Sequence, residues 1–211
     1  MAAVSQYVDL SVLAAGETRN AMLQALAAIS KVHGVGEMLV STVVERRASP
    51  KTRGAYDPET HEISIARNAP HKELTAVEEI GHKIHDEAFG FASGAGNTPL
   101  DKVIEPWASA AAETQSAKDL AAAVRAAKNL AIKARLAYLA KPEEQFARDY
   151  SHYVALKSGS APLLSQIRKE RADIMQLGHL AYRPDEEMQA VSAAFDKIFA
   201  VKGLELKPES S

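Results

Sequence analysis

The chain has 211 residues, of which 46% are hydrophobic and 25% are charged, a globular composition that excludes wholesale disorder. Its 25 Lys and Arg residues against 27 Asp and Glu residues give a formal net charge of −2, so no overall attraction to nucleic acid or to an anionic membrane is expected. Cysteine is absent, which excludes disulfides, thiolate metal sites and cysteine nucleophiles and leaves His, Asp and Glu as the strong metal ligands.

Neither a targeting segment nor a membrane span is expected. The first seven residues contain no basic side chain, and no apolar run approaches the about 18 residues that a membrane-spanning helix needs. We therefore expect a protein that stays in the cytoplasm or is packaged from it, without a membrane partner.

The first part of the chain predicts a helix, a small sheet and a second helix. Residues 17–33 have a helical apolar pattern that ends before Gly34. Residues 37–47 are rich in β-branched side chains and predict a strand, and residues 53–66 predict a hairpin around an Asp-Pro turn. A helical period resumes over residues 71–89, with an apolar stripe formed by Leu74, Val77, Gly81, Ile84 and Ala88.

The remainder predicts helices. A glycine-rich loop precedes the alanine-rich residues 101–140, which fit one or two long helices. Prolines open three further helices, at Pro142 to about residue 157, at Pro162 to about 177 and at Pro184 to about 203. The fold class expected is therefore α+β, mostly helical, with a small antiparallel sheet. We expect a single domain over residues 1–206 and a flexible tail over 207–211.

The helix predicted over residues 71–89 carries several side chains that bind metals or transfer protons. At 100° per residue, His82 lies about 40° and His85 about −20° from Glu78, so these three share one face. Glu79 lies about 100° from Glu78, within reach of anything bound at His82. Two imidazoles and a carboxylate are a plausible cradle for a divalent metal, with zinc preferred for these donors. The alternative is a solvated helix face on which Glu78 and His82 form an ordinary pair one turn apart.

The sequence T-A-V-E-E-I-G-H-K-I-H after a strand and a hairpin resembles the zincin metallopeptidases, whose active helix reads H-E-(I/L)-G-H after a small sheet. A second segment, from Lys141 to Tyr153, is similar to P-E-E-F-F-A-E-x-F-A-x-Y of gluzincin-like enzymes. That group includes anthrax-lethal-factor-like enzymes and zincin domains of phage head-morphogenesis and toxin proteins. The resemblance covers roughly residues 37–157 and makes the alanine-rich segment, about 101–140, an insertion.

The resemblance implies a role for each matching residue. Glu79 corresponds to the general base, His82 to the second histidine ligand and Glu144 to the third zinc ligand. Glu143 competes with Glu144 for that place, and His85 is a further possible ligand. Tyr150 or Tyr153 corresponds to a hydroxyl that stabilises the oxyanion. The chain departs from the family at Glu78, where the family has its first histidine, and a second anionic ligand would weaken the activation of a zinc-bound water. The alternative is a site without metal, in which the carboxylates of Glu78, Glu79 and Glu144 near His82 need protons or a basic neighbour such as Arg148.

Two functions follow from this resemblance to the zincins. The first is a zinc peptidase in which Glu79 takes a proton from metal-bound water that attacks a peptide carbonyl. The second is a catalytically inactive zincin scaffold that serves as a phage morphogenesis, virion-structural or protein-binding component. Both predict a peptide or protein partner. Nucleic acid is an unlikely partner, although Lys118, Arg125, Lys128 and Arg135 could form a basic stripe on the alanine-rich helix that meets nucleic acid or an acidic protein surface. A helical nucleic-acid or scaffold-binding protein is therefore a third, weaker alternative.

Overall fold

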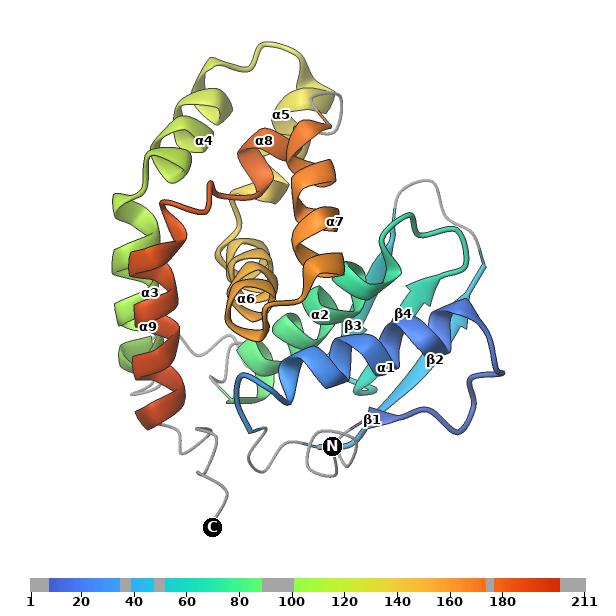
Figure 1. Ribbon diagram of the computed structural model, residues 1–211. Coiled ribbons are helices and arrows are strands. Elements are labelled where there is room, and N and C mark those ends of the chain that lie inside the picture. The colour runs from blue at the N-terminus through green and yellow to red at the C-terminus, as the bar shows by residue number, and fades with distance from the viewer. Residues whose placement is uncertain (1–7, 35–38, 48–51, 89–100, 174–176, 202–211) are drawn as a thin grey trace.

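Most of the chain is helical, and a small sheet lies at one side of the helices (Figure 1). The computed structural model describes residues 8–34, 39–47, 52–88, 101–173 and 177–201. The combination of many helices with one sheet confirms the expected α+β class. The tail predicted over residues 207–211 lies outside the described residues.

The sheet has four strands in the order β1-β2-β4-β3. β1 (Val8–Asp9) pairs in parallel with β2 (Ser41–Arg46), and β2 pairs in parallel with β4 (Glu62–Ala66). Only β3 (Gly54–Asp57), which forms the predicted hairpin with β4, is antiparallel among the described pairs. The prediction of an antiparallel sheet was therefore wrong. A helix connects β1 to β2, and such a crossover returns the chain in the same direction.

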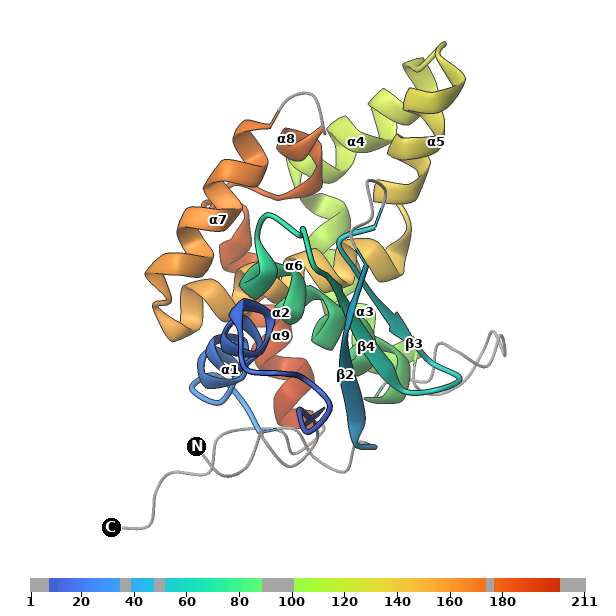
Figure 2. The ribbon, with the colours of Figure 1, turned by 90° about the vertical axis from the view of Figure 1, so that its right-hand side faces the viewer.

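Two helices pack on one another beside the sheet, as Figures 1 and 2 show. α1 (Glu17–Ile29) and α2 (Lys72–Lys83) contribute buried apolar side chains to the main core, and α2 continues into a short π-helical turn over Ile84–Ala88. The predicted apolar stripe is buried at Leu74, Val77 and Ile84. Figure 2 shows β3 at the outer edge of the sheet.

The alanine-rich segment forms three helices rather than one or two. They are α3 (Asp101–Glu113), α4 (Gln115–Ala126) and α5 (Leu130–Leu139). The breaks fall where the side chains of Thr114 and Asn129 accept hydrogen bonds from backbone N–H groups of the next helix, which caps that helix and ends the previous one. α3 joins the main core, whereas α4 and α5 meet in a small separate cluster and project from the body (Figure 2).

α6 (Pro142–Ser158) runs through the middle of the molecule and contacts α2, α7 and α9 (Figure 1). It begins at Pro142 as predicted and ends at Gly159, whose φ of 66° is the left-handed conformation that favours glycine after a helix. α7 (Ala161–Ala172) stops five residues before the predicted end, and a four-residue helix, α8 (Gly178–Ala181), follows it. The last helix, α9 (Met188–Val201), starts after a turn at residues 185–187.

Gly81 lets α2 and α6 approach closely. A Cβ atom at Gly81 would lie 2.9 Å from Cδ1 of Tyr150 and 3.1 Å from the backbone Cα of Ala147, which is closer than ordinary contacts allow. This close crossing brings the second half of α2 alongside the first half of α6. The two segments that carry the resemblance to zincins therefore lie side by side.

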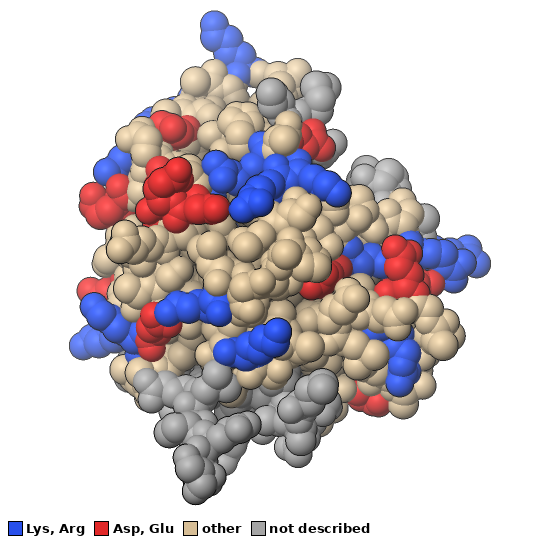
Figure 3. All heavy atoms as spheres, viewed as in Figure 1, with Lys and Arg blue, Asp and Glu red and all other residues tan. Residues whose placement is uncertain are grey.

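The face of the molecule seen in Figure 3 shows no dominant charge. On the face in Figure 3, acidic and basic side chains form small separate groups around a wide uncharged area. Among the described helices, none has both the length and the apolar character required to cross a membrane.

Candidate functional site

A cleft of about 1120 Å³ lies between the start of β3, the second half of α2, and helices α5 to α8. Its lining is mostly polar and charged. It contains Glu78, Glu79, His82, His85, Glu143 and Glu144, which are the six carboxylate and imidazole residues singled out in the sequence. Cavities of this size accommodate small molecules or short peptide segments.

Glu78, Glu79 and His82 of α2 and His85 of the following π-helical turn line this cleft. Glu79 is 6% exposed and His85 is 3% exposed, and the His85 ring lies 4.8 Å from that of Phe146. A solvated helix face would leave these side chains open to water. That alternative is wrong for Glu79 and His85, although Glu78 and His82 remain partly exposed.

Glu144 is the carboxylate of α6 that lies next to the imidazole of His82 on α2. Its Oε1 lies 3.7 Å from Nε2 of His82. The competing residue, Glu143, also lines the cleft, but its side chain is 44% exposed and lies 3.4 Å from Nζ of Lys141. The orientation of α6 thus favours Glu144 over Glu143 as the partner of His82.

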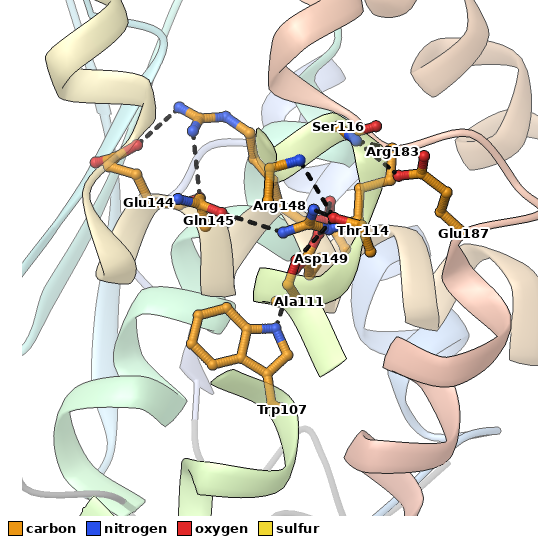
Figure 4. A network of polar contacts seen from close by, with 12 residues as sticks. Trp107, Ala111, Thr114, Ser116, Glu144, Gln145, Arg148, Asp149, Arg183 and Glu187 are labelled. Atoms are coloured by element: carbon orange, nitrogen blue, oxygen red, sulfur yellow. Dashed lines mark hydrogen bonds and ion pairs between the residues drawn. The ribbon is translucent and has the colours of Figure 1, made fainter. Parts of the chain in front are cut away.

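Arg148 holds the other oxygen of Glu144. Its Nη2 donates to Oε2 of Glu144 at 2.8 Å, and its Nη1 donates to the backbone oxygen of Glu144 at 3.3 Å, one turn earlier on α6 (Figure 4). Arg148 is only 9% exposed. Burial disfavours its charge, but the nearby carboxylates of Glu78 and Glu144 outweigh this effect and raise its pKa. A permanent positive charge therefore lies among the acidic groups of the cleft.

Glu78 is engaged from the opposite wall. The hydroxyl of Tyr182, which follows α8, donates a hydrogen bond to Oε1 of Glu78. Burial raises the pKa of Glu78, while Arg148 and the bond from Tyr182 act in the opposite direction. Burial beside this acid also raises the pKa of Tyr182 well above its usual range, so its phenol stays a hydrogen-bond donor at neutral pH.

Glu79 lies between α2 and the edge strand. A Cβ atom at Gly54 would be 2.6 Å from its Oε1, so β3 approaches this carboxyl group closely because residue 54 has no side chain. The backbone of Tyr56 acts to lower the pKa of this carboxyl group. Burial, followed by the charges of Glu78 and Glu144, raises the pKa of Glu79 well above its usual value, which favours its neutral acid form.

Both imidazoles of the cleft favour the neutral form. Burial lowers the pKa of His82, against the opposing effect of Glu144. Burial lowers the pKa of His85 to about 4. Neither ring therefore supplies the positive charge that the surrounding carboxylates require at neutral pH.

The two tyrosines suggested for the oxyanion lie elsewhere. Tyr150 is fully buried and its hydroxyl is 2.9 Å from Nε2 of His33, while Tyr153 donates to Asp196 on α9 at 2.8 Å. Neither belongs to the described lining of the cleft, so this assignment needs correction. Because of the helical period of α6, the side chains of Tyr150 and Tyr153 point into the core and away from Glu144.

The tyrosines that do line the cleft are Tyr56, Tyr138 and Tyr182. Sequence reasoning assigned none of these tyrosines to the site, nor Arg53 and Glu170, and it placed Arg135 on a basic stripe instead. Arg53, the residue before β3, forms an ion pair with Glu170 on α7. These residues come from separate elements without a common spacing, so no sequence pattern marked them. The one available signal was the position of Tyr182 shortly before a proline, which indicates a chain turn.

A buried polar network holds the segment that carries Tyr182. The neighbouring Arg183 donates to Oδ1 of Asp149 at 2.8 Å and also to Thr114, and the indole of Trp107 donates to Oδ2 of Asp149 at 3.0 Å (Figure 4). Arg183 and Asp149 are both almost fully buried. This network joins α3, α6 and the chain after α8, and thereby positions Tyr182 opposite Glu78.

The residues implied by the resemblance do not fit a zinc site as they are arranged. In the part of the chain that the structure describes, no group of three or more His, Asp or Glu side chains is placed to hold a metal ion. One oxygen of Glu144 is bound by Arg148 and one oxygen of Glu78 is bound by Tyr182. The guanidinium of Arg148, which lies near Glu78 and Glu144, also repels a divalent cation.

The basic stripe suggested on one alanine-rich helix is not formed. Lys118 lies on α4 and is 3.4 Å from Oε2 of Glu113, whereas Arg135 lies on α5 and lines the cleft. Because the segment breaks into separate helices, the spacing of these basic residues no longer places them on a common face. Arg135 instead lies with its guanidinium 5.3 Å from the centre of the Tyr138 ring.

Comparison with protein-family models, with curated proteins and with solved structures finds no match for this chain.

Proposed function

We propose that this chain is a zincin-like scaffold whose cleft binds a peptide or a protein segment without hydrolysing it. The observation that carries the proposal is the ion pair between Arg148 and Glu144. It places an internal cation beside the carboxylates that would otherwise be expected to bind a metal. The same charge is unfavourable for a metal-activated water, on which peptide hydrolysis in this class depends.

The form of the cleft supports binding of a chain segment. The cleft runs beside β3, which pairs only with β4 among the described strands and forms an edge of the sheet. On the other side, Arg135 and the 39% exposed Tyr138 present a cation and an aromatic ring at the mouth. An aromatic side chain next to hydrogen-bonding groups is common where proteins bind peptides. A place in phage morphogenesis or in a virion is a proposal that rests on the resemblance alone.

The proposal is tested with peptides selected on the immobilised protein from a random twelve-residue library. The selected peptide is synthesised and titrated into the protein in a calorimeter. We expect Arg135→Ala combined with Tyr138→Ala to weaken binding by roughly tenfold or more, since an aromatic and a charged contact are both lost. Lys133→Ala is the matched control, because Lys133 is an exposed cation of the same helix outside the cleft lining.

Two outcomes would contradict the proposal. One is equal affinity of the selected peptide for the wild type and for the double variant, which would place binding outside the cleft. The other is cleavage of the peptide by the wild type, observed by mass spectrometry after incubation with zinc, together with close to one bound zinc per chain.

A further inference from the structure

The cleft contains a cluster of three carboxyl groups, Glu78, Glu79 and Glu144, which we call the carboxylate cluster. Its members come from two helices that cross closely at Gly81. Acidic groups in such a site repel one another and lose hydration, so they require protons or a cation nearby. The identity of that cation determines what the site can bind.

Arg148 is the buried cation of this cluster. It binds Glu144 through two donors, one to the carboxylate and one to the backbone oxygen, and the carboxylates of Glu78 and Glu144 favour its charged form against the effect of burial. The other two arginines of the described lining are engaged differently. Arg53 pairs with Glu170, and Arg135 lies over the ring of Tyr138.

The position of Arg148 is fixed on several sides. The ion pair joins residues one turn apart on α6, so it forms within one rigid element. The guanidinium carbon also lies 5.8 Å from the centre of the Tyr138 ring, a favourable distance for a cation and an aromatic face. Such a side chain does not move away from the carboxylates without losing all of these contacts together.

We infer that the Arg148 guanidinium is the resident cation of the carboxylate cluster and that it excludes a divalent metal from the space between Glu78, His82 and Glu144. Arg148 neutralises the acids, occupies an oxygen of Glu144 and repels a second cation. The replacement of the zincin histidine by Glu78 is then not sufficient to explain why the cleft does not fit zinc. Arg148 keeps the site closed to metal even when residue 78 is a histidine.

The inference concerns the same cleft as the proposed function, but it does not depend on peptide binding. The full chain is tested as the wild type and as three variants, namely Glu78→His, Arg148→Ala and the two substitutions combined. Zinc alone is the probe. Its stoichiometry is measured by elemental analysis after gel filtration, and its affinity by competition with a chromogenic chelator.

We expect the wild type and Glu78→His to retain almost no zinc. The combined variant is expected to bind close to one zinc per chain, at least roughly tenfold more tightly than Glu78→His, and to melt at a higher temperature when zinc is added. In the combined variant a histidine replaces the carboxylate at position 78, so less uncompensated negative charge remains after the loss of Arg148. The combined variant is therefore expected to fold more readily than Arg148→Ala. Adding Glu144→Gln to the combined variant should remove the gained zinc binding.

Either of two results would overturn the inference. Tight zinc binding by Glu78→His with Arg148 intact would show that the arginine does not exclude metal. A folded combined variant that binds no zinc would show that the cluster is not a latent metal site. Failure of the wild type to bind any selected peptide would contradict the proposed function alone and leave these zinc measurements unaffected.

Discussion

Glu144 lies 3.7 Å from His82, although α3, α4 and α5 separate the two residues in the sequence. The contact exists because α2 and α6 cross where Gly81 meets Ala147. The same geometry places Arg148 on the far side of Glu144, so that the carboxylate is shared between an imidazole and a guanidinium. The predictions below test what this arrangement contributes to stability and binding.

Removing the guanidinium should destabilise the protein strongly. We expect Arg148→Met to lower the free energy of unfolding by about 3 to 5 kcal/mol, because it leaves buried carboxylates without a counter-ion. Urea denaturation at neutral pH measures the change. Lys133→Met, an exposed site on α5, is the control and should change stability by less than about 0.5 kcal/mol. An equally small effect at both positions would show that Arg148 does not compensate the cluster.

Chelation should leave the thermal stability unchanged. If Arg148 supplies the positive charge of the cleft, the fold does not depend on a bound metal, and the melting temperature with and without EDTA should agree within error. Differential scanning calorimetry of protein purified without chelator provides the comparison. A fall in the melting temperature with EDTA that zinc reverses would contradict the proposed role of Arg148.

The crossing of α2 and α6 should not tolerate a methyl group. Gly81→Ala places a Cβ 3.1 Å from the backbone of Ala147, so the helices must separate, at a cost of roughly 1 to 3 kcal/mol. Gly16→Ala is the control, because a Cβ there has open space around it and the backbone is extended. Similar stabilities of the two variants in urea would show that the close crossing is not needed.

His33 should make the protein less stable in mild acid. Burial lowers its pKa from 6.5 to about 4, so the folded state disfavours the protonated ring. The contribution of neutral His33 to the free energy of unfolding is fully present above pH 6.5 and is lost as the pH falls through about 4. The largest loss expected from this residue is roughly 3 kcal/mol. Urea denaturation at pH 7 and pH 4.5 should show a larger loss for the wild type than for His33→Gln.

The control for this experiment is His179→Gln, since the His179 side chain is exposed. It should reproduce the pH dependence of the wild type. If His33→Gln also behaves like the wild type, protonation of His33 does not limit acid stability.

The buried network around Asp149 should be required for folding stability. Arg183→Met leaves Asp149 without its ion-pair partner and is expected to cost about 3 to 5 kcal/mol. The single tryptophan of the chain, Trp107, donates to the same carboxylate, so its fluorescence reports the change directly. Arg168→Met on the exposed side of α7 is the control, and equal unfolding midpoints would exclude this role of Arg183.

Local patterns in the sequence determined much of the fold. The alternation at residues 61–66 and the Asp-Pro turn before it predicted the hairpin of β3 and β4, because side chains alternate between the faces of a strand. Pro142 fixed the start of α6, since proline favours the first turn of a helix. The spacing of Glu78, Glu79, His82 and His85 likewise placed four chemically important residues along α2 and the π-helical turn that follows it.

Tertiary structure decided the partners of these residues. Whether strands run parallel depends on the path of the connecting helix, so strand residues alone did not indicate the mixed sheet. The period of α6 was compatible with a core position or a cleft position for Tyr150, and packing placed it in the core. Tyr182 meets Glu78 because the next residue, Arg183, is held by a buried network on other helices. The sequence by itself therefore determined which acids and imidazoles this helical segment carries, whereas the crossing of α2 and α6 brought the guanidinium of Arg148 beside carboxylates of both helices.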